Sequence, residues 1–396
     1  NGDLKVSTGT LTILGQGHKL TIKKDTSSCS MVISNGATVN LGTKEGVGKQ
    51  ENALILTSID DTSAVINMGG SAVLNMYHGV EIRDSRAGSQ AGGVQLVGDK
   101  TVFNMYGGMI DNCENWASVA GGVYIDGGGL FNMYDGVIRN CSGSKGGAVC
   151  VSGADPIYDG YISGSSGFHM YGGTIKDCHD KGLGGGAVCV YTAEPVSFIM
   201  DGGTITGCNA DGEAGYGYGG AVFISTPHKD AVIKINKGEI SGNSGAYGGG
   251  IYVEEGNVEI ADGVALHNNT ATKEGDDLYN KSGSVTLGKL PTGLKLAACG
   301  CDIDGWYHDK TGARWSSKKC GGEADRMKKY TETTITEGCA LKAAHGEAPA
   351  PPIIIVPEAP EQEAPNPTTG SRDLVGVAAA MAVVSLLGAA AVIRKK

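Results

Sequence analysis

Four cysteines end four copies of one motif, and cysteine can ligate metals, attack substrates or form disulfides. The copies begin at residues 103, 131, 168 and 198 and read FNMYGGMIDNC, FNMYDGVIRNC, FHMYGGTIKDC and FIMDGGTITGC. The cysteines are Cys113, Cys141, Cys178 and Cys208. The fourth possibility is a structural role, in which each cysteine is a small buried side chain that fills a fixed place in the fold and does no chemistry.

The elements that position these cysteines follow from a repeat of about 30 residues. A second block follows each motif and reads GGVYI at 121, GGAVCV at 146 and 185, and GGAVFI at 219. Apolar side chains recur at every second position of both blocks, which is the strand period. Short segments such as GTI and GVI lie between the blocks. Glycine, 66 of 396 residues, interrupts every unit.

A unit of three short strands with one apolar face cannot bury that face alone, but stacked units close a continuous core. We therefore predict an all-β fold, a right-handed parallel β-helix over residues 1–287. Adjacent coils should lie ~4.8 Å apart.

In such a stack the four cysteines form one column, which continues as Ser85 before them and as Asn243 and Asn269 after them. Every member is small and able to form hydrogen bonds, so we expect buried free thiols at a corner of the coil. A nucleophile is needed once, beside a base, and metal ligands must converge from several directions. Disulfides between coils fit the coil spacing. Disulfides and a metal site therefore remain the two alternatives to free thiols.

Two outward columns carry aromatic side chains. One contains Tyr77, Tyr106, Tyr134 and Tyr171. Like side chains on neighbouring strands stabilise each other, so this column is interpreted as a solvent-side ladder, with a sugar-stacking face as the alternative. The other column is expected to lie under loops and contains Gln95, Tyr124, Cys150, Cys189, Phe223 and Tyr252.

Variable loops after the cysteine corner should line up along one edge of the rod, at 114–120, 179–184, 209–218 and 244–247. Loops on a rigid scaffold are where binding usually occurs. The candidate ligand-binding residues are therefore aromatic: Trp116, Tyr216, Tyr218 and Tyr247, with Tyr106 and Tyr134 of the ladder as the second choice. Loops that simply fold onto the rod are the alternative.

The charge pattern argues against several functions. A net charge of −10 without a basic patch argues against nucleic acid as a partner. The row Arg83, Asp111, Arg139 and Lys176 alternates in sign at its start and does not gather carboxylates. We therefore predict no catalytic residue, no metal and no cofactor, and do not expect an enzyme.

The repeats resemble the β-helix regions of bacterial surface proteins, including the chlamydial polymorphic outer-membrane proteins. The resemblance implies the architecture and says little about activity. Because pectate lyases and polygalacturonases share this pectin-lyase-like fold, a polysaccharide lyase or glycoside hydrolase is the alternative function.

Residues 288–346 form a predicted small β module with four cysteines, Cys299, Cys301, Cys320 and Cys339. Its GWY, RWS and ALKAAHG segments resemble small β modules found in Gram-positive surface proteins. Two disulfides are expected, because small exported domains need such cross-links. Zinc is the rival interpretation, although Cys-x-Cys departs from the usual spacing.

The C-terminal segment changes composition abruptly. Residues 347–365 are a proline-rich spacer, and residues 374–393 are an uncharged stretch long enough to span a bilayer. Arg394, Lys395 and Lys396 follow, and such cations favour the cytoplasmic side. A plain membrane anchor is one interpretation of this order.

Residues 366–396 as a whole resemble a Gram-positive cell-wall sorting signal. The motif is Asn366, Pro367, Thr368, Thr369 and Gly370, with Asn where the family usually has Leu. The resemblance implies cleavage by a sortase after Thr369 and attachment of Thr369 to peptidoglycan. The expected protein is thus an extracellular, wall-anchored rod that acts as an adhesin and binds a glycan or a host surface protein.

Overall fold

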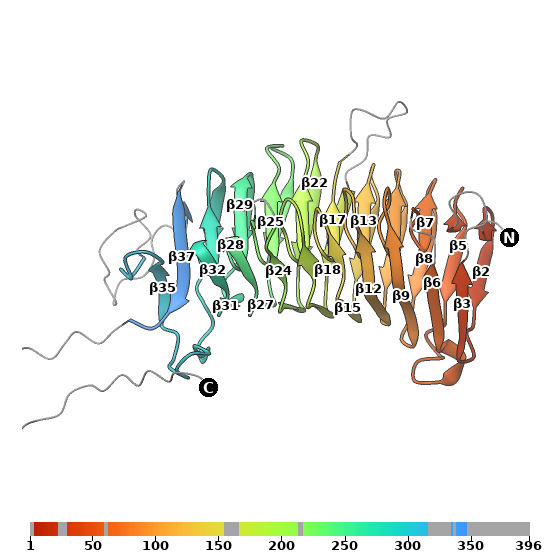
Figure 1. Cartoon of the computed structure of the whole chain (residues 1–396), viewed down its shortest axis with the longest axis horizontal. Helices are drawn as coiled ribbons and strands as arrows, with labels where there is room; N and C mark the ends of the chain where they lie inside the picture. The colour runs from red at the N-terminus through yellow and green to blue at the C-terminus, as the bar shows by residue number, and fades with distance from the viewer. Residues whose placement is uncertain are drawn as a thin grey trace, which may run out of the picture. The chain divides into compact units, whose positions relative to one another are not determined.

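The computed structural model describes residues 4–22, 30–58, 62–153, 166–212, 217–315, 334–335 and 338–346. These residues belong to one compact unit, Asn1–Glu347, and a second unit, Ala348–Lys396, lies outside the described residues. Three long sheets run through the first unit, and the chain visits each sheet in turn (Figure 1). The all-β prediction is confirmed, and the parallel stack is consistent with the predicted β-helix.

Each coil contributes one strand to sheets A and B and one or two to sheet C. The parallel strands of sheet A are β1 (Leu4–Val6), β4 (Met31–Ile33), β7 (Ile66–Gly69), β10 (Val94–Val97), β13 (Val123–Asp126), β17 (Val149–Val151), β21 (Val188–Tyr191), β25 (Val222–Ser225), β29 (Ile251–Glu255) and β33 (Leu278–Asn280). Those of sheet B are β2 (Thr10–Ile13), β5 (Thr38–Leu41), β8 (Val73–Met76), β11 (Val102–Met105), β14 (Leu130–Met133), β18 (Ser166–Met170), β22 (Val196–Met200), β26 (Val232–Ile235), β30 (Asn257–Ile260) and β34 (Ser284–Leu287).

Sheet C contains two columns of strands that the long strands β9 (Val80–Ala87) and β12 (Met109–Asn115) join. The first column contains β3 (His18–Ile22), β6 (Leu54–Ser58), β15 (Val137–Arg139), β19 (Thr174–Lys176), β23 (Thr204–Thr206), β27 (Glu239–Ser241) and β31 (Ala265–His267). The second contains β16 (Ser142–Gly143), β20 (His179–Asp180), β24 (Asn209–Ala210), β28 (Ser244–Tyr247) and β32 (Thr270–Glu274). A 3-10 turn, η1 (Gln50–Asn52), lies in the loop before β6.

The predicted module at 288–346 extends the sheets of the rod. Its strands are β35 (Gly305–His308), β36 (Thr334–Ile335) and β37 (Cys339–Ala344). Strand β37 pairs antiparallel with β33, and β36 pairs antiparallel with β34. The reversal of direction ends the parallel stack. The buried Trp306 lies at this end, and its Nε1 donates to the carbonyl of Gly288 at 3.2 Å.

The core of the rod consists of columns of like side chains. Phe103 pairs in register with Phe131, and the same column continues through Phe168 and Phe198. Their rings stack with centroids 4.8, 5.0 and 5.6 Å apart, and all four are fully buried. Alternation within each strand therefore turns one face of every sheet inward, as the period of two predicted.

The cysteine column is a row of buried free thiols at the corner after the first strand column of sheet C. The Sγ of Cys178 donates to the carbonyl of Lys176 at 3.2 Å and of Ile138, one coil earlier, at 3.9 Å. At the equivalent position, the Nδ2 of Asn243 donates to Ser241 and Ile205, each at 3.1 Å. The thiol and the amide donate to equivalent carbonyls. The prediction of buried free thiols at a corner of the coil is therefore confirmed.

Candidate functional site

Trp116 is the most exposed large apolar side chain among the described residues, with 54% of its surface accessible. It directly follows β12, at the corner where the chain leaves sheet C for sheet A. Its backbone N–H still donates to the carbonyl of Ala87, one coil earlier, at 3.0 Å. The main chain that carries the indole is therefore part of the stack.

Asn115 fixes the loop that carries Trp116. Its side chain is 1% exposed, and its Oδ1 accepts three backbone N–H groups, from Ala117, Ser118 and Val119, at 2.8 to 3.0 Å. Its Nδ2 donates to the carbonyl of Gln90 at 2.6 Å. One buried amide thus replaces the hydrogen bonds that a regular strand would make, and the loop is preorganised.

Gly88, on the preceding coil, makes room for the indole. A Cβ added to Gly88 would lie 2.5 Å from Cζ2 and 2.9 Å from Cε2 of Trp116, closer than atoms can approach. The indole therefore lies against the backbone at Gly88, and much of its remaining surface is open. An exposed aromatic surface on a fixed loop can stack on a sugar ring or serve as an anchor for a protein partner.

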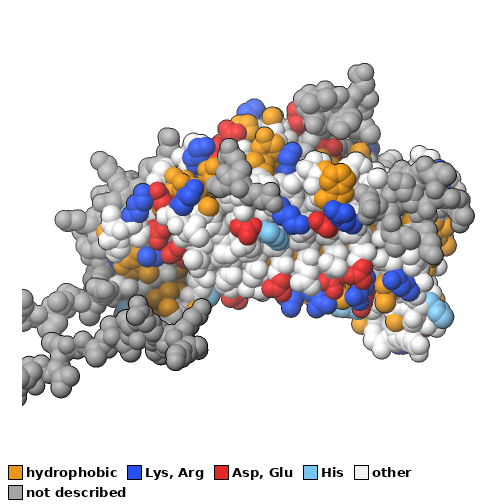
Figure 2. Space-filling view, viewed as in Figure 1, with side chains coloured by type: hydrophobic (Ala, Val, Ile, Leu, Met, Phe, Trp, Pro, Cys, Tyr) orange, Lys and Arg blue, Asp and Glu red, His pale blue; other side chains and the backbone are white. Residues whose placement is uncertain are grey.

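An ion-pair network lies beside this loop. Glu114 pairs with Arg86 of the previous coil at 3.3 Å and with Lys181 of a later loop at 2.9 Å. The hydrogen bond from Lys181 lowers the pKa of the Glu114 carboxyl, which therefore stays ionised near neutral pH. Figure 2 shows the same mixing on the face in view, where positive and negative side chains lie close together. Both signs of charge are therefore present next to the loop that carries the exposed indole.

The other aromatic candidates of the loop edge are packed differently. Tyr218 and Tyr247 are half-buried and cover the outer face of sheet A. The ring of Tyr218 stacks on that of Tyr252 at 4.6 Å, and the ring of Tyr247 lies 5.5 Å from that of Tyr279. Beneath them Cys150, Cys189 and Phe223 are buried, so loops cover this outer column as expected. Tyr216 lies outside the described residues.

The tyrosine ladder forms a continuous stack on the outside of the rod. Tyr106 and Tyr134 are 37% and 39% exposed. Ring centroids from Tyr77 through Tyr106 and Tyr134 to Tyr171 are 5.3, 5.0 and 4.7 Å apart, with interplanar angles of at most 21°. Neighbouring rungs therefore cover each other's faces, and the ring edges remain for solvent or ligand. This geometry favours the ladder interpretation over a sugar-stacking face.

Beside the tyrosine ladder, an amide ladder of Asn40, Asn75, Asn104 and Asn132 is closed by side-chain hydrogen bonds between successive coils. The distances are 2.9, 3.0 and 2.9 Å. Each of the three donating amides keeps one donor hydrogen outside this chain of bonds. The surface next to the rings is thus polar and regular.

The alternating row of charges is found in sheet C. Asp111 lies in register between Arg83 and Arg139, and Arg139 is in register with Lys176. Burial of Asp111 opposes ionisation, but hydrogen bonds from Arg139 and Asn140 outweigh it and lower the pKa of Asp111. The Arg139 to Asp111 distance is 2.9 Å.

The module cysteines are partly described. Cys299 and Cys301 form a disulfide, and Cys339 is also disulfide-bonded. Cys320 lies outside the described residues, as does the predicted sorting motif Asn366 to Gly370. Within the described ranges, no group of three or more His, Cys, Asp or Glu is arranged to hold a metal ion. The same ranges include no helix with the length and apolar character needed to cross a membrane, and residues 374–393 are not among them.

A comparison with protein-family models finds no match, and neither do comparisons with curated proteins and with solved structures. The site must therefore be interpreted from its own geometry. Sequence reasoning selected Trp116 but missed Asn115 and Gly88. The signal for Asn115 was an amide at the end of a strand before a loop, and Gly88 gave none, because its role depends on a contact between coils.

Proposed function

We propose that this protein is a rod displayed on a cell surface that binds carbohydrate through the exposed indole of Trp116. The observation that carries the proposal is an indole that is 54% exposed on a loop fixed by the buried Asn115. A rigid aromatic side chain gives contact area with little loss of conformational entropy on binding. Glu114, Arg86 and Lys181 add charged groups that can hydrogen bond with sugar hydroxyls or anionic substituents.

Wall anchoring is the second part of the proposal and depends on the sequence of residues 347–396. A proline-rich spacer, the motif ending at Thr369 and Gly370, an apolar span and a basic tail occur in that order. A sortase would cleave after Thr369 and join it to peptidoglycan. Mass spectrometry of wall-released protein should show Thr369 as the C-terminal residue, linked to a peptidoglycan fragment. Mature surface protein that retains residues 394–396 would refute covalent anchoring.

A glycan and mucin array tests the binding function. The full chain should bind a subset of glycans, and Trp116→Ala should weaken that binding ~10-fold or more, as the loss of an aromatic anchor typically does. Gly88→Ala should weaken glycan binding too. This variant keeps Trp116, but the new methyl group displaces its indole. The matched control is Tyr134→Ala on the ladder, which should bind normally. Equal binding by Trp116→Ala and the unchanged chain would overturn the assignment.

A reducing-sugar release assay on every glycan that binds separates binding from cleavage. If freshly purified protein still releases new reducing ends, that result would favour the alternative, a polysaccharide-cleaving enzyme. Binding without release is the result we expect.

A further inference from the structure

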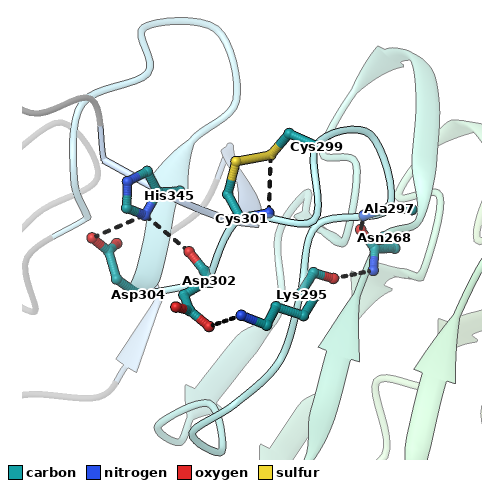
Figure 3. Close-up of a disulfide and its surroundings, with 8 residues drawn as sticks. All are labelled: Asn268, Lys295, Ala297, Cys299, Cys301, Asp302, Asp304 and His345. Atoms are coloured by element: carbon teal, nitrogen blue, oxygen red, sulfur yellow. Dashed lines mark hydrogen bonds and ion pairs between the residues drawn. A yellow bond between two sulfur atoms is a disulfide. The ribbon is translucent and has the colours of Figure 1, made fainter.

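The disulfide between Cys299 and Cys301 closes a ring of three residues in the segment between β34 and β35 (Figure 3). Cys299 and Gly300 are exposed, and a Cβ added to Gly300 would meet no atom within 4 Å. The six free cysteines of the described ranges are all buried, and so is Cys339. Within the part of the chain that the structure describes, this ring is therefore the sulfur pair that solvent reaches.

The segment keeps its shape through hydrogen bonds that do not involve sulfur. The N–H of Gly300 donates to the carbonyl of Leu296 at 2.8 Å, and the N–H of Leu296 donates to the carbonyl of Cys301 at 2.9 Å. Asn268, on the last regular corner of the rod, donates to the carbonyl of Lys295 at 2.8 Å and accepts from the N–H of Ala297 at 2.9 Å (Figure 3). These bonds would remain after reduction of the disulfide.

A purely structural role explains this disulfide poorly. Cross-links stabilise a fold mainly by restricting the unfolded chain, and the effect is smallest for the shortest loops. A ring of three residues restricts very little chain, and the hydrogen bonds above already fix its two ends. Exposed disulfides of this kind are the ones that undergo exchange.

The local hydrogen bonds also favour one direction of exchange. The N–H of Cys301 donates to the Sγ of Cys299 at 3.2 Å. A donor at that sulfur stabilises the negative charge that Cys299 acquires when the disulfide opens, and a more stable thiolate leaves faster. Attack at the Sγ of Cys301 is therefore favoured over attack at the Sγ of Cys299.

We propose that Cys299 and Cys301 form a thiol–disulfide exchange site whose substrates are accessible thiols. A substrate thiolate attacks the Sγ of Cys301, forms a mixed disulfide with it and breaks the bond to Cys299, which leaves as a thiolate. A second substrate thiolate then attacks the substrate sulfur of the mixed disulfide and releases the Cys301 thiolate. The substrate pair is oxidised by two electrons, the Cys299–Cys301 pair is reduced, and the two protons lost by the substrate thiols are taken up by the two cysteines.

Titration of the full chain with reduced and oxidised glutathione tests the proposal. Free thiols are alkylated at each ratio and located by mass spectrometry, so that each disulfide is followed separately. The disulfide of the buried Cys339 is the internal reference. We expect Cys299 and Cys301 to become reduced at a ratio of reduced to oxidised glutathione ~100-fold below the ratio that reduces Cys339, with circular dichroism unchanged.

Glutathione attached to Cys301 and not to Cys299 should be detected at intermediate ratios, which supports the proposed direction. The double variant Cys299→Ser, Cys301→Ser should fold normally and lose the ability to oxidise an added dithiol. Reduction of both disulfides at one common ratio, or dithiol oxidation retained by the double variant, would overturn the proposal.

Discussion

At the scale of single residues, position in the coil decides the structural role of a side chain more than its residue type does. The corner column contains serine, cysteine and asparagine, and Cys178 and Asn243 donate to equivalent carbonyls, one of the same coil and one of the coil before. Burial raises the pKa of the Cys178 thiol well above its usual range, so the thiol stays protonated and unreactive near neutral pH. These sulfurs are structural, in contrast to the disulfide of the exposed Cys299 and the half-buried Cys301.

Cys208 tests this equivalence, because its neighbour in the column is Asn243. Cys208→Asn should change the free energy of unfolding by less than about 1 kcal/mol, since an amide can donate to the carbonyl of Thr206, which accepts from the Cys208 thiol at 3.5 Å. Cys208→Val removes the donor from a buried site and should cost about 1–3 kcal/mol. Urea denaturation of both variants measures the difference. A valine variant as stable as the asparagine variant would show that the hydrogen bonds at this corner do not matter.

At the scale of elements, the same aromatic residue types have three different uses on this rod. Phenylalanine rings stack inside sheet B, tyrosine rings stack outside the turn that follows sheet B, and tyrosines from the loops cover the outer face of sheet A. The indole of Trp116 differs because it lies over the backbone at Gly88 and is 54% exposed. We assign this exposed surface to a ligand, whereas each ladder ring is covered by its neighbours.

The tyrosine ladder should contribute to stability and not to binding. Tyr134 stacks on Tyr106 at 5.0 Å and on Tyr171 at 4.7 Å, so Tyr134→Ala removes two ring contacts. At about 0.5–1.5 kcal/mol for each aromatic pair, the variant should lose about 1–3 kcal/mol. Thermal unfolding measures the loss. A variant with unchanged stability and impaired glycan binding would place the binding site on the ladder and contradict the assignment to Trp116.

At the scale of the whole molecule, two buried carboxyls connect its stability to pH. Burial raises the pKa of Asp180 to about 7, although its oxygens accept hydrogen bonds from Gly146 and Gly182. Burial likewise raises the pKa of Asp277 to about 7, and Asp277 accepts from the N–H of Ala343 at 2.7 Å and so connects the last coil to β37. In the unfolded chain both carboxyls have lost their protons by about pH 5.

The folded chain therefore holds protons near pH 6.5 that the unfolded chain has released. Stability from these groups is full below the unfolded pKa and is lost as pH rises through about 7, at up to ~1.4 kcal/mol per pH unit for each group. We expect the melting temperature to fall between about pH 5 and 7 and to level off above pH 7, and the slope to shrink in Asp180→Asn and Asp277→Asn. Asp302→Asn is the control, because a hydrogen bond from Lys295 lowers the pKa of Asp302 in the folded chain, so this carboxyl is ionised in both states over this range. A melting temperature that rises over this range would contradict the account.

Periodic features of this molecule could be predicted from the sequence, and features that depend on contacts between distant coils could not. Met105 and Met133 are 28 residues apart and lie in register, because the repeat itself encodes which residues become neighbours. The place of Gly88 under Trp116 depends on how two loops of different length pack, and the repeat does not encode that. The antiparallel pairing of β37 with β33 was not predicted either, since the 288–346 segment does not share the repeat.

The quenching of tryptophan fluorescence by iodide tests the central claim most directly. The chain has three tryptophans, and Trp306 and Trp315 are 2% and 3% exposed, so a small ionic quencher reaches Trp116 almost alone. If a glycan from the array covers the indole, the quenchable fraction should fall to the level of Trp116→Ala, and the emission should shift to shorter wavelength as water leaves the ring. A glycan that binds while iodide quenching of Trp116 stays unchanged would show that the ligand lies elsewhere and would contradict the account.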